Sequence, residues 1–257
     1  MLFAQLDRWL SPAPRPAKVA WLKDHEYAHR GLHHAGVPEN SPSAFAGAIA
    51  RGMGIECDVH RSADGHAIVF HDEELERLTG HKGLLAQHSA AELTAMTLLG
   101  SEDKIPTLRA LLDQIGGKVP LLIEIKSEDS MSRGRVSNLC LAVRRQLEGY
   151  LGQHAVMSFD PRVVRWFADH SPLTVRGLVV TEEDDKVLPG MIRSRLALWH
   201  AKPEFLAYDV RDLPSRFAGA QRARGLPLLT WTVRSAEHRE RAEDYADAPI
   251  AEGQGVL

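Results

Sequence analysis

The sequence contains few cysteines. Only two, Cys57 and Cys140, occur among 257 residues. They lie far apart, in segments predicted as a strand and a helix, so neither a disulfide framework nor a cysteine metal site is expected. The N-terminus places Asp7 and Arg8 where a secretory signal would need an apolar run. These features together predict a protein of a reducing compartment, the cytoplasm.

The sequence also lacks a large excess of charge and any long apolar run. Its 31 basic and 34 acidic residues give a formal net charge of -3, which provides no reason to expect a nucleic-acid partner. No apolar stretch has the length that a membrane-spanning helix needs, so we expect no stable membrane insertion. Residues 1–26 are predicted as a short amphipathic helix and a proline-rich linker whose apolar side chains cover the edge of a core.

From residue 27 onward, short β-like runs alternate with helical segments. Such alternation with apolar strands implies a parallel sheet covered by helices. Seven units and a weaker eighth strand, 246–252, predict an α/β fold over residues 27–257, a (β/α)8 TIM barrel that lacks its last helix. The other predicted strands are 27–31, 54–60, 121–126, 154–159, 174–180, 204–210 and 227–233. The predicted helices are 41–51, 107–115, 133–148, 161–169, 191–199, 214–224 and 235–245.

A doubly wound open sheet is the competing architecture. No Gly-x-Gly-x-x-Gly or Walker-type loop follows the first strand, and polar residues lie at the ends of several strands, which favours the barrel. One segment, about 72–106, breaks the alternation and is predicted as a small insertion after the hairpin of the second strand. Insertions above the carboxyl ends of barrel strands commonly shape a site.

The second strand carries two acidic residues at alternate positions. Glu56 and Asp58 are two residues apart, so both side chains point to the same side of the strand. The dipeptide Asp64-Gly65 indicates a two-residue hairpin turn. This turn would place His71 opposite Asp58. We therefore expect the hairpin to return His71 to the barrel rim beside the two carboxylates.

The third strand adds a further acid and a base. Glu124 and Lys126 share one face near its carboxyl end, which is costly in a buried strand unless they pair with each other or bind an ion. If Glu124 converges with Glu56 and Asp58, the all-oxygen site suits Mg²⁺ or Ca²⁺. Zinc is not favoured, because the cluster contains no cysteine or paired histidine and the His-x-His of zinc amidohydrolases is absent from the first strand.

The same rim carries cationic and titratable side chains. Arg30 and Lys126 suit a phosphate group, and His29 and His71 titrate near neutral pH. A metal, two cations and two imidazoles describe a site for phosphoryl transfer. One histidine would deprotonate the nucleophile while the other protonates the leaving alkoxide.

The motifs, taken in order, resemble those of the glycerophosphodiester phosphodiesterase family. They are "HRG" at 29–31, "PEN" at 38–40, "ECD" at 56–58, "DG" at 64–65, "HD" at 71–72, "EIK" at 124–126, "SF" at 158–159 and "WTV" at 231–233. The resemblance implies a TIM barrel and a metal-dependent hydrolysis of glycerophosphodiesters to sn-glycerol 3-phosphate and an alcohol, a reaction of lipid and glycerol metabolism. It also implies that the 2-hydroxyl of the substrate attacks phosphorus to give a cyclic phosphate that water opens.

The resemblance further implies a role for each matching residue. By this resemblance, His29 and His71 are the acid/base pair, and Glu56, Asp58 and Glu124 are the metal ligands. Glu39 lies close to the metal or its water. Arg30 and Lys126 bind the phosphate, and Trp231 lines the substrate pocket.

The sequence departs from the family pattern at His33-His34, at Arg234 and in the final "ADAPIAEG". Three alternatives stay open on the same fold: a phospholipase-D-like activity on intact phospholipids, a lysophospholipid phosphodiesterase, and a non-catalytic scaffold that binds metal or phosphate. The preferred alcohol, the choice between Mg²⁺ and Ca²⁺, the oligomeric state and the role of the N-terminal helix also stay open.

Overall fold

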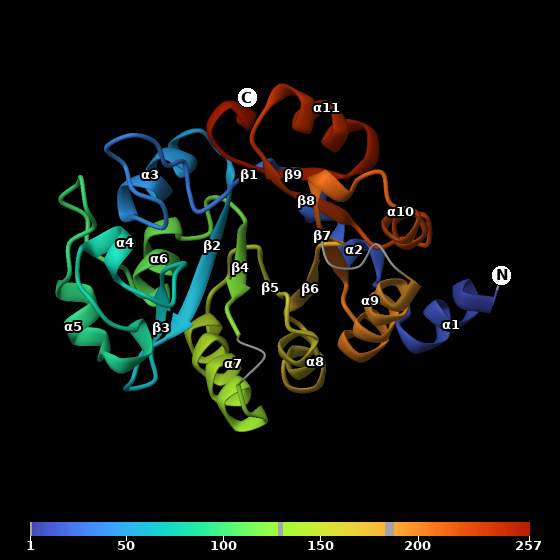
Figure 1. The fold of residues 1–257 in the computed structure, drawn as a ribbon, viewed down its shortest axis with the longest axis horizontal. Coiled ribbons are helices and arrows are strands. Elements are labelled where there is room, and N and C mark those ends of the chain that lie inside the picture. The colour runs from blue at the N-terminus through green and yellow to red at the C-terminus, as the bar shows by residue number, and fades with distance from the viewer. Residues whose placement is uncertain (1, 128–130, 183–187) are drawn as a thin grey trace. The chain divides into compact units, whose positions relative to one another are not determined.

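The structure, a computed structural model, describes residues 2–127, 131–182 and 188–257. The chain divides into two compact units (Figure 1). One consists of residues 27–154, and the other of residues 1–26 together with 155–257.

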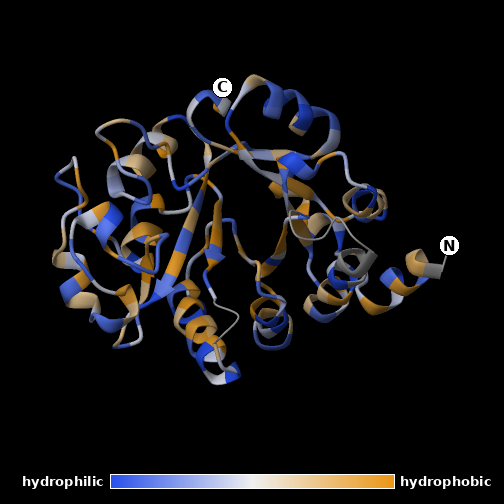
Figure 2. Cartoon of the chain, viewed as in Figure 1, coloured by the Kyte–Doolittle hydropathy of each residue, from blue (hydrophilic) through white to orange (hydrophobic). Residues whose placement is uncertain are grey.

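In the unit 27–154, three parallel strands are accompanied by one antiparallel hairpin strand. β2 pairs in parallel with β1 and β4, and β3 runs antiparallel to β2. All residues of β4 are buried, and Figure 2 shows this strand as hydrophobic with a hydrophilic segment near its tip. The elements are β1 (Tyr27–Ala28), α3 (Pro42–Ala50), β2 (Gly54–Arg61), β3 (Ala67–Val69), α4 (Glu76–Thr79), η2 (Leu85–Gln87), α5 (Ala90–Ala95), α6 (Leu108–Ile115), β4 (Leu121–Ile125) and α7 (Arg133–Leu147).

In the second unit, five parallel strands pair in chain order, from β5 to β9, and helices lie between them in the sequence. Within its described residues, the 3-10 turn η4 follows β9 and no α-helix does. The elements are α1 (Leu2–Leu10), α2 (Pro16–Val19), η1 (Ala20–Lys23), β5 (His154–Ser158), α8 (Pro161–His170), β6 (Val175–Val180), α9 (Leu188–Ala201), β7 (Phe205–Asp209), η3 (Val210–Asp212), α10 (Arg216–Ala223), β8 (Leu228–Val233), α11 (Ala236–Tyr245), β9 (Ala248–Ala251) and η4 (Gly253–Gly255).

The predicted (β/α)8 class is confirmed. Among the described residues, three parallel strands in one unit and five in the other alternate along the sequence with helices. Within each unit, every parallel strand pairs with the next parallel strand along the chain. The strand order of a doubly wound sheet reverses at a switch point. The sequential order therefore excludes the open-sheet alternative.

Local hydrogen bonds set the starts of two helices. The Ser41 hydroxyl accepts a hydrogen bond from the amide of Ala44 at 3.1 Å, and Pro42 occupies the first turn of α3. Thr107 caps α6 in the same way through the amide of Ala110. These caps satisfy amides that would otherwise lack a partner in the first turn of the helix.

The predicted insertion folds around a small core of its own. Leu75, Leu85 and Leu93 are almost completely buried with the end of the hairpin in one hydrophobic cluster. A capping box of Ser89 and Glu92 begins α5. This packing holds α4 and α5 in place beside the hairpin, on the left in Figure 1.

The predicted register of the hairpin is wrong by one residue. Val59 pairs with Val69, and the amide of Phe70, not of His71, bonds to the carbonyl of Asp58 at 3.0 Å. The loop has three residues instead of two, because the amide of Gly65, at φ 93°, bonds back to the carbonyl of Ser62. A turn followed by a residue of positive φ is the usual three-residue hairpin loop. His71 lies just beyond the end of β3.

The predicted first strand is too long. β1 ends at Ala28, and His29 and Arg30 lie in the turn that follows. Arg30 and Gly31 have φ values of 55° and 78°, so the chain leaves the extended conformation there. A Cβ on Gly31 would lie 2.9 Å from the backbone of Ala44. Glycine therefore permits this turn to press against α3.

Polar contacts help to anchor residues 1–26 to the rest of the second unit. Asp7 is buried and accepts hydrogen bonds from the indole of Trp199 at 2.8 Å and the amide of Gln221 at 2.9 Å. Arg224 donates to the carbonyl of Ser11 at 2.6 Å. Of the apolar residues of this segment, Val19 and Leu22 are buried, whereas Phe3 is 49% exposed.

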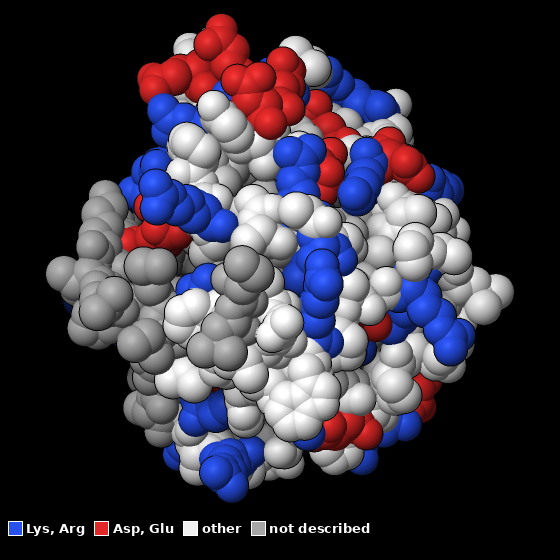
Figure 3. All heavy atoms as spheres, turned by 90° about the vertical axis from the view of Figure 1, so that its right-hand side faces the viewer, with Lys and Arg blue, Asp and Glu red and all other residues white. Residues whose placement is uncertain are grey.

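The surface carries mixed charge. Figure 3 shows basic and acidic side chains interspersed over one face, with acidic side chains gathered at its upper edge, where α11 lies. Within the described part of the chain, none of the helices combines the length and the apolar character that crossing a membrane requires.

Candidate active site

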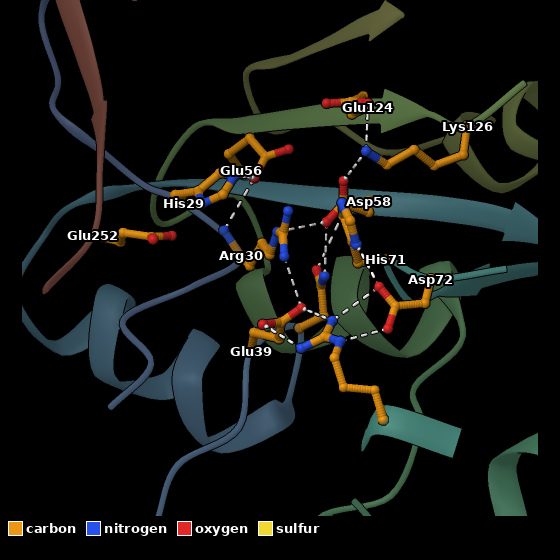
Figure 4. A network of polar contacts seen from close by, with 12 residues as sticks. His29, Arg30, Glu39, Glu56, Asp58, His71, Asp72, Glu124, Lys126 and Glu252 are labelled. Atoms are coloured by element: carbon orange, nitrogen blue, oxygen red, sulfur yellow. Dashed lines mark hydrogen bonds and ion pairs between the residues drawn. The ribbon is translucent and has the colours of Figure 1, made fainter. Parts of the chain in front are cut away.

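Three carboxylates converge at the carboxyl ends of two neighbouring strands. Glu56 and Asp58 lie on β2 and Glu124 on β4, and the parallel register sets Asp58 beside Glu124. One ligand oxygen of each lies within 4.8 Å of the others. All three side chains are buried. The predicted alternation along these strands therefore brings the acids together (Figure 4).

Glu56 has the least compensated charge of the three. Burial and the negative charges of Asp58 and Glu124 raise the pKa of Glu56 well above its ordinary value. Among the described residues, its buried Oε1 has no hydrogen-bond partner, while its Oε2 accepts from the amide of Arg30 at 3.0 Å. Cys57, between the two acids of β2, is also buried, and burial together with the nearby carboxylates raises the pKa of its thiol.

Asp58 is stabilised as an anion by the groups around it. Burial alone would raise its pKa, but Lys126 and Arg30 outweigh that effect and lower it. Lys126 Nζ lies 2.9 Å from Asp58 Oδ1 and 2.6 Å from Glu124 Oε1, and the pKa of Lys126 is raised because these acids outweigh its burial. The amide of Asn40 donates to Asp58 Oδ2 at 2.9 Å.

The turn after β1 directs Arg30 into the same cluster. Its Nη1 donates to Glu39 Oε1 at 2.8 Å, and its Nε lies 3.2 Å from Asp58 Oδ2. Burial opposes the charge of Arg30, but the surrounding carboxylates outweigh it and raise its pKa. Arg30 and Lys126 thus present two cations beside the carboxylates, an arrangement that suits a phosphate.

The two predicted acid/base residues both lie in the unit 27–154. His29 is 8% exposed, with Nε2 4.0 Å from Glu56 Oε2. His71 Nδ1 lies 2.7 Å from Asp72 Oδ1, and the carbonyl of His71 is 2.8 Å from His60 Nε2. An ionised carboxylate can only accept, so the Nδ1 proton of His71 points to Asp72 and the Nε2 lone pair is available to a substrate.

A pocket of about 740 Å³ opens beside the cluster, lined by both His71 and Lys126. His60, Asp72 and Arg77 also line it. It provides space for part of a small molecule next to a candidate acid/base and a candidate phosphate-binding residue.

The remaining predicted positions differ in setting. Trp231 is part of the unit 1–26/155–257, where its indole donates to the carbonyl of Ala207 at 2.9 Å and its ring lies edge-on to Phe159 at 5.4 Å. His34 belongs to the loop tip that bridges to Val37. Arg234 forms an ion pair with Glu252 at 2.5 Å.

The donor set fits a divalent cation. Three buried carboxylates supply oxygen ligands of the kind that Mg²⁺ and Ca²⁺ prefer, and the orphaned oxygen of Glu56 lies among them. A buried acceptor that lacks a partner costs free energy that a bound cation would recover. Glu56, Asp58 and Glu124 could hold the ion. Glu39 is linked to the cluster by its hydrogen bond with Arg30.

Four residues of the network escaped the sequence reasoning: Asn40, His60, Asp72 and Arg77. Asn40 and Asp72 are the last residues of the "PEN" and "HD" motifs, which is a signal that could have found them. His60 has no motif, and Arg77 lies in the insertion, where no periodic pattern indicates which face is buried.

Comparisons with known proteins give a family match and similar solved structures. Residues 29–251 match the model of the Glycerophosphoryl diester phosphodiesterase family. The chain is 30% identical over 227 residues to the glycerophosphodiester phosphodiesterase of Caldanaerobacter subterraneus subsp. tengcongensis, which covers 83% of this chain and 87% of that protein. Two solved structures share the fold. A phosphodiesterase of Oleispira antarctica in complex with the product sn-glycerol-3-phosphate has TM-score 0.76 and 22% identity, covering 88% of this chain and 92% of the other. A glycerophosphodiester phosphodiesterase of Thermotoga maritima has TM-score 0.70 and 24% identity, with coverage of 88% and 92%.

Proposed function

The chain belongs to the glycerophosphoryl diester phosphodiesterase family, and from this membership we propose that it hydrolyses glycerophosphodiesters to sn-glycerol 3-phosphate and an alcohol with the aid of a divalent cation. One observation carries the proposal: buried carboxylates, two cations and two histidines gather at the carboxyl ends of β1, β2 and β4. The sn-glycerol 3-phosphate held by the Oleispira antarctica relative supports the product.

In this proposal Arg30 and Lys126 bind the phosphate of the substrate, because both cations lie beside the carboxylate cluster and are held there by Asp58. The family motif assigns Trp231 a role in lining the substrate pocket, although this residue is not among those that line the pocket beside His71. The pocket beside His71 accommodates a part of the substrate. A cation bound by Glu56, Asp58 and Glu124 would supply neutralisation of the charge that develops on the phosphate oxygens.

His29 and His71 provide the proton transfers. One accepts the proton of the attacking hydroxyl, the 2-hydroxyl of the glycerol moiety, as its oxygen bonds to phosphorus. The other donates a proton to the alcohol oxygen as the bond from phosphorus to that oxygen breaks. Water then opens the cyclic phosphate with the roles of the histidines exchanged. An aligned acid and base each contribute on the order of 10² to 10⁴ in rate.

Purified protein incubated with glycerophosphocholine, glycerophosphoethanolamine and a lysophospholipid, each with Mg²⁺, Ca²⁺ or EDTA, tests the proposal. We expect release of glycerol 3-phosphate from the first two substrates and its loss in EDTA. Turnover that EDTA leaves unchanged would contradict the metal site, and turnover of the lysophospholipid alone would contradict the substrate class.

Histidine variants test the acid/base assignment. His29→Ala and His71→Ala should each lower kcat by on the order of 10² or more. His66→Ala is the matched control, since this histidine is in the same unit, is half exposed and pairs with Asp64 in the hairpin loop. A wild-type rate in either of the first two variants would refute the assignment.

A further inference from the structure

Arg77, on α4 of the insertion, connects two carboxylates of the site. Its Nε and Nη2 donate to Oδ2 and Oδ1 of Asp72 at 2.5 and 2.9 Å. Its Nη2 and Nη1 also donate to Oε1 and Oε2 of Glu39 at 2.7 and 3.2 Å. The Arg77 side chain thus fixes the orientation of the carboxylate groups of both Asp72 and Glu39.

Asp72 is the acid that faces the ring of His71. Its Oδ1 lies 2.7 Å from His71 Nδ1 and also accepts from Arg77. A two-pronged contact with arginine restricts rotation of a carboxylate more than a single hydrogen bond does. Arg77 therefore determines where Asp72 presents the oxygen that meets His71.

We propose that Arg77 is a positioning residue for His71, acting through Asp72. By holding the Asp72 carboxylate, Arg77 keeps the Nδ1 proton of His71 on the Asp72 side and the Nε2 lone pair toward the substrate. The inference rests on the proposed role of His71 in phosphodiester hydrolysis. The same guanidinium holds Glu39 against Arg30, so the orientation of the histidine and that of the phosphate-binding arginine are set together.

The fold of the insertion does not depend on this side chain. Arg77 is 49% exposed. The helix that carries it is held by buried Leu75, by the Thr79 hydroxyl on the carbonyl of Leu75 at 2.7 Å, and by the amide of Leu75 on the carbonyl of Gly83 at 3.0 Å. Loss of the guanidinium should therefore release Asp72 without unfolding α4.

Steady-state kinetics of Arg77→Gln, Arg77→Lys and Asp72→Asn on glycerophosphocholine test the proposal. We expect Arg77→Gln to lower kcat by on the order of 10- to 100-fold, the usual loss when a residue that orients a functional side chain is removed. KM should change by less than about threefold. Arg77→Lys keeps the charge but not the fork, so its kcat should lie between those of the wild type and Arg77→Gln. The double variant Arg77→Gln/Asp72→Asn should have nearly the same kcat as Asp72→Asn alone, because Arg77 acts on His71 through Asp72.

Arg109→Gln is the matched control. Arg109 is 43% exposed and pairs with Asp113 in the same unit, yet it contacts none of the residues in the site. Its kcat should equal that of the wild type. A wild-type kcat for Arg77→Gln, or full additivity with Asp72→Asn, would overturn the proposal.

A nitrogen NMR spectrum of the histidines gives a readout that needs no turnover. The signals of His71 are identified because they are missing from the spectrum of His71→Ala. They should show the ring proton on Nδ1 in the wild type and distributed over both nitrogens in Arg77→Gln. An unchanged tautomer in Arg77→Gln or, if that variant misfolds, in Arg77→Lys would overturn the proposal. If the wild type turns over no glycerophosphodiester, the proposed function fails, while the tautomer still decides whether Arg77 positions His71.

Discussion

At the scale of the residue, Glu56 is a side chain whose surroundings oppose its charge. It shares a buried site with Asp58 and Glu124, and the two cations of the cluster contact Asp58 more closely than they contact Glu56. The burial and repulsion that raise its pKa mean that a divalent cation would relieve an existing cost.

Replacing Glu56 with Gln should therefore have opposite effects with and without metal. In EDTA, the melting temperature should rise, because a buried repulsion is removed. With excess Mg²⁺ or Ca²⁺, the wild type should gain about 2.7 kcal/mol at 100 times Kd, and the variant should gain little. Thermal melts measure both effects, with Glu240→Gln, an exposed acid of α11, as the control. Equal metal-induced shifts in wild type and Glu56→Gln would show that Glu56 is no ligand.

His154 gives a pH dependence that is independent of the site. Burial lowers its pKa below the ordinary value of 6.5, although its ring also bonds to the carbonyl of Gly152. The unfolded chain therefore binds the proton at a higher pH than the folded chain does. The contribution of His154 to stability is fully present above pH 6.5 and is lost as the pH falls through the folded pKa.

His154→Asn should remove that part of the pH dependence and leave a side chain that can still donate to Gly152. Urea unfolding at pH 5.5 and 7.5 measures the change. The wild type should lose more free energy of unfolding than the variant between these two values. An identical loss in both proteins would contradict the linkage.

At the scale of the element, the attachment of α1 depends on one buried acid. Asp7→Ala would leave the donors of Trp199 and Gln221 without their acceptor. The free energy of unfolding should fall by on the order of 2 to 3 kcal/mol, as measured by urea denaturation. The exposed Asp24→Ala should change it by less than about 0.5 kcal/mol. A loss for Asp7→Ala no larger than that of the control would mean that α1 is held by its apolar residues.

The regular elements could be predicted because their patterns are local. Period-two alternation in β2 and β4 predicted that Glu56 and Asp58 share one face and Glu124 and Lys126 another, and the parallel register then sets Asp58 beside Glu124. The end of β1 was mispredicted because Arg30 takes a positive φ, a conformation rarely adopted by arginine. The hairpin was mispredicted because Asp-Gly suits two loop lengths. The longer loop lets Asp64 accept from the amide of Ala90 at 2.9 Å, a contact 26 residues away.

At the scale of the whole molecule, the sequence predicted the class of fold but not the network around His71. From residue 27 onward, apart from the insertion, strands alternate with helices, because a parallel sheet must be covered by helices to be buried. The partners of Arg77 depend on how a non-repeating insertion packs, so no short pattern encodes them. The division into two units is equally absent from the pattern, because residues 1–26 join 155–257 through side chains far apart in sequence.

The three carboxylates proposed as metal ligands, Glu56, Asp58 and Glu124, all lie within the unit 27–154. A divalent cation should therefore slow amide hydrogen exchange in β2 and β4 more than in β6 to β8, because it stabilises local openings unequally. Hydrogen-exchange mass spectrometry with and without Mg²⁺ measures this difference, and Glu56→Gln should abolish it. Equal protection throughout the chain would contradict a site confined to one unit.

The thiol of Cys57, which lies on β2, allows the opening of this strand to be measured. A thiol must be both accessible and ionised before an alkylating reagent attacks it. Cys57 is completely buried, and burial together with the nearby carboxylates raises the pKa of its thiol and disfavours the thiolate. Its alkylation in the folded protein thus reports how often β2 separates from its neighbours. Mass spectrometry of the peptide that contains Cys57, at increasing times of reaction, would give the opening frequency of the candidate active site without any substrate.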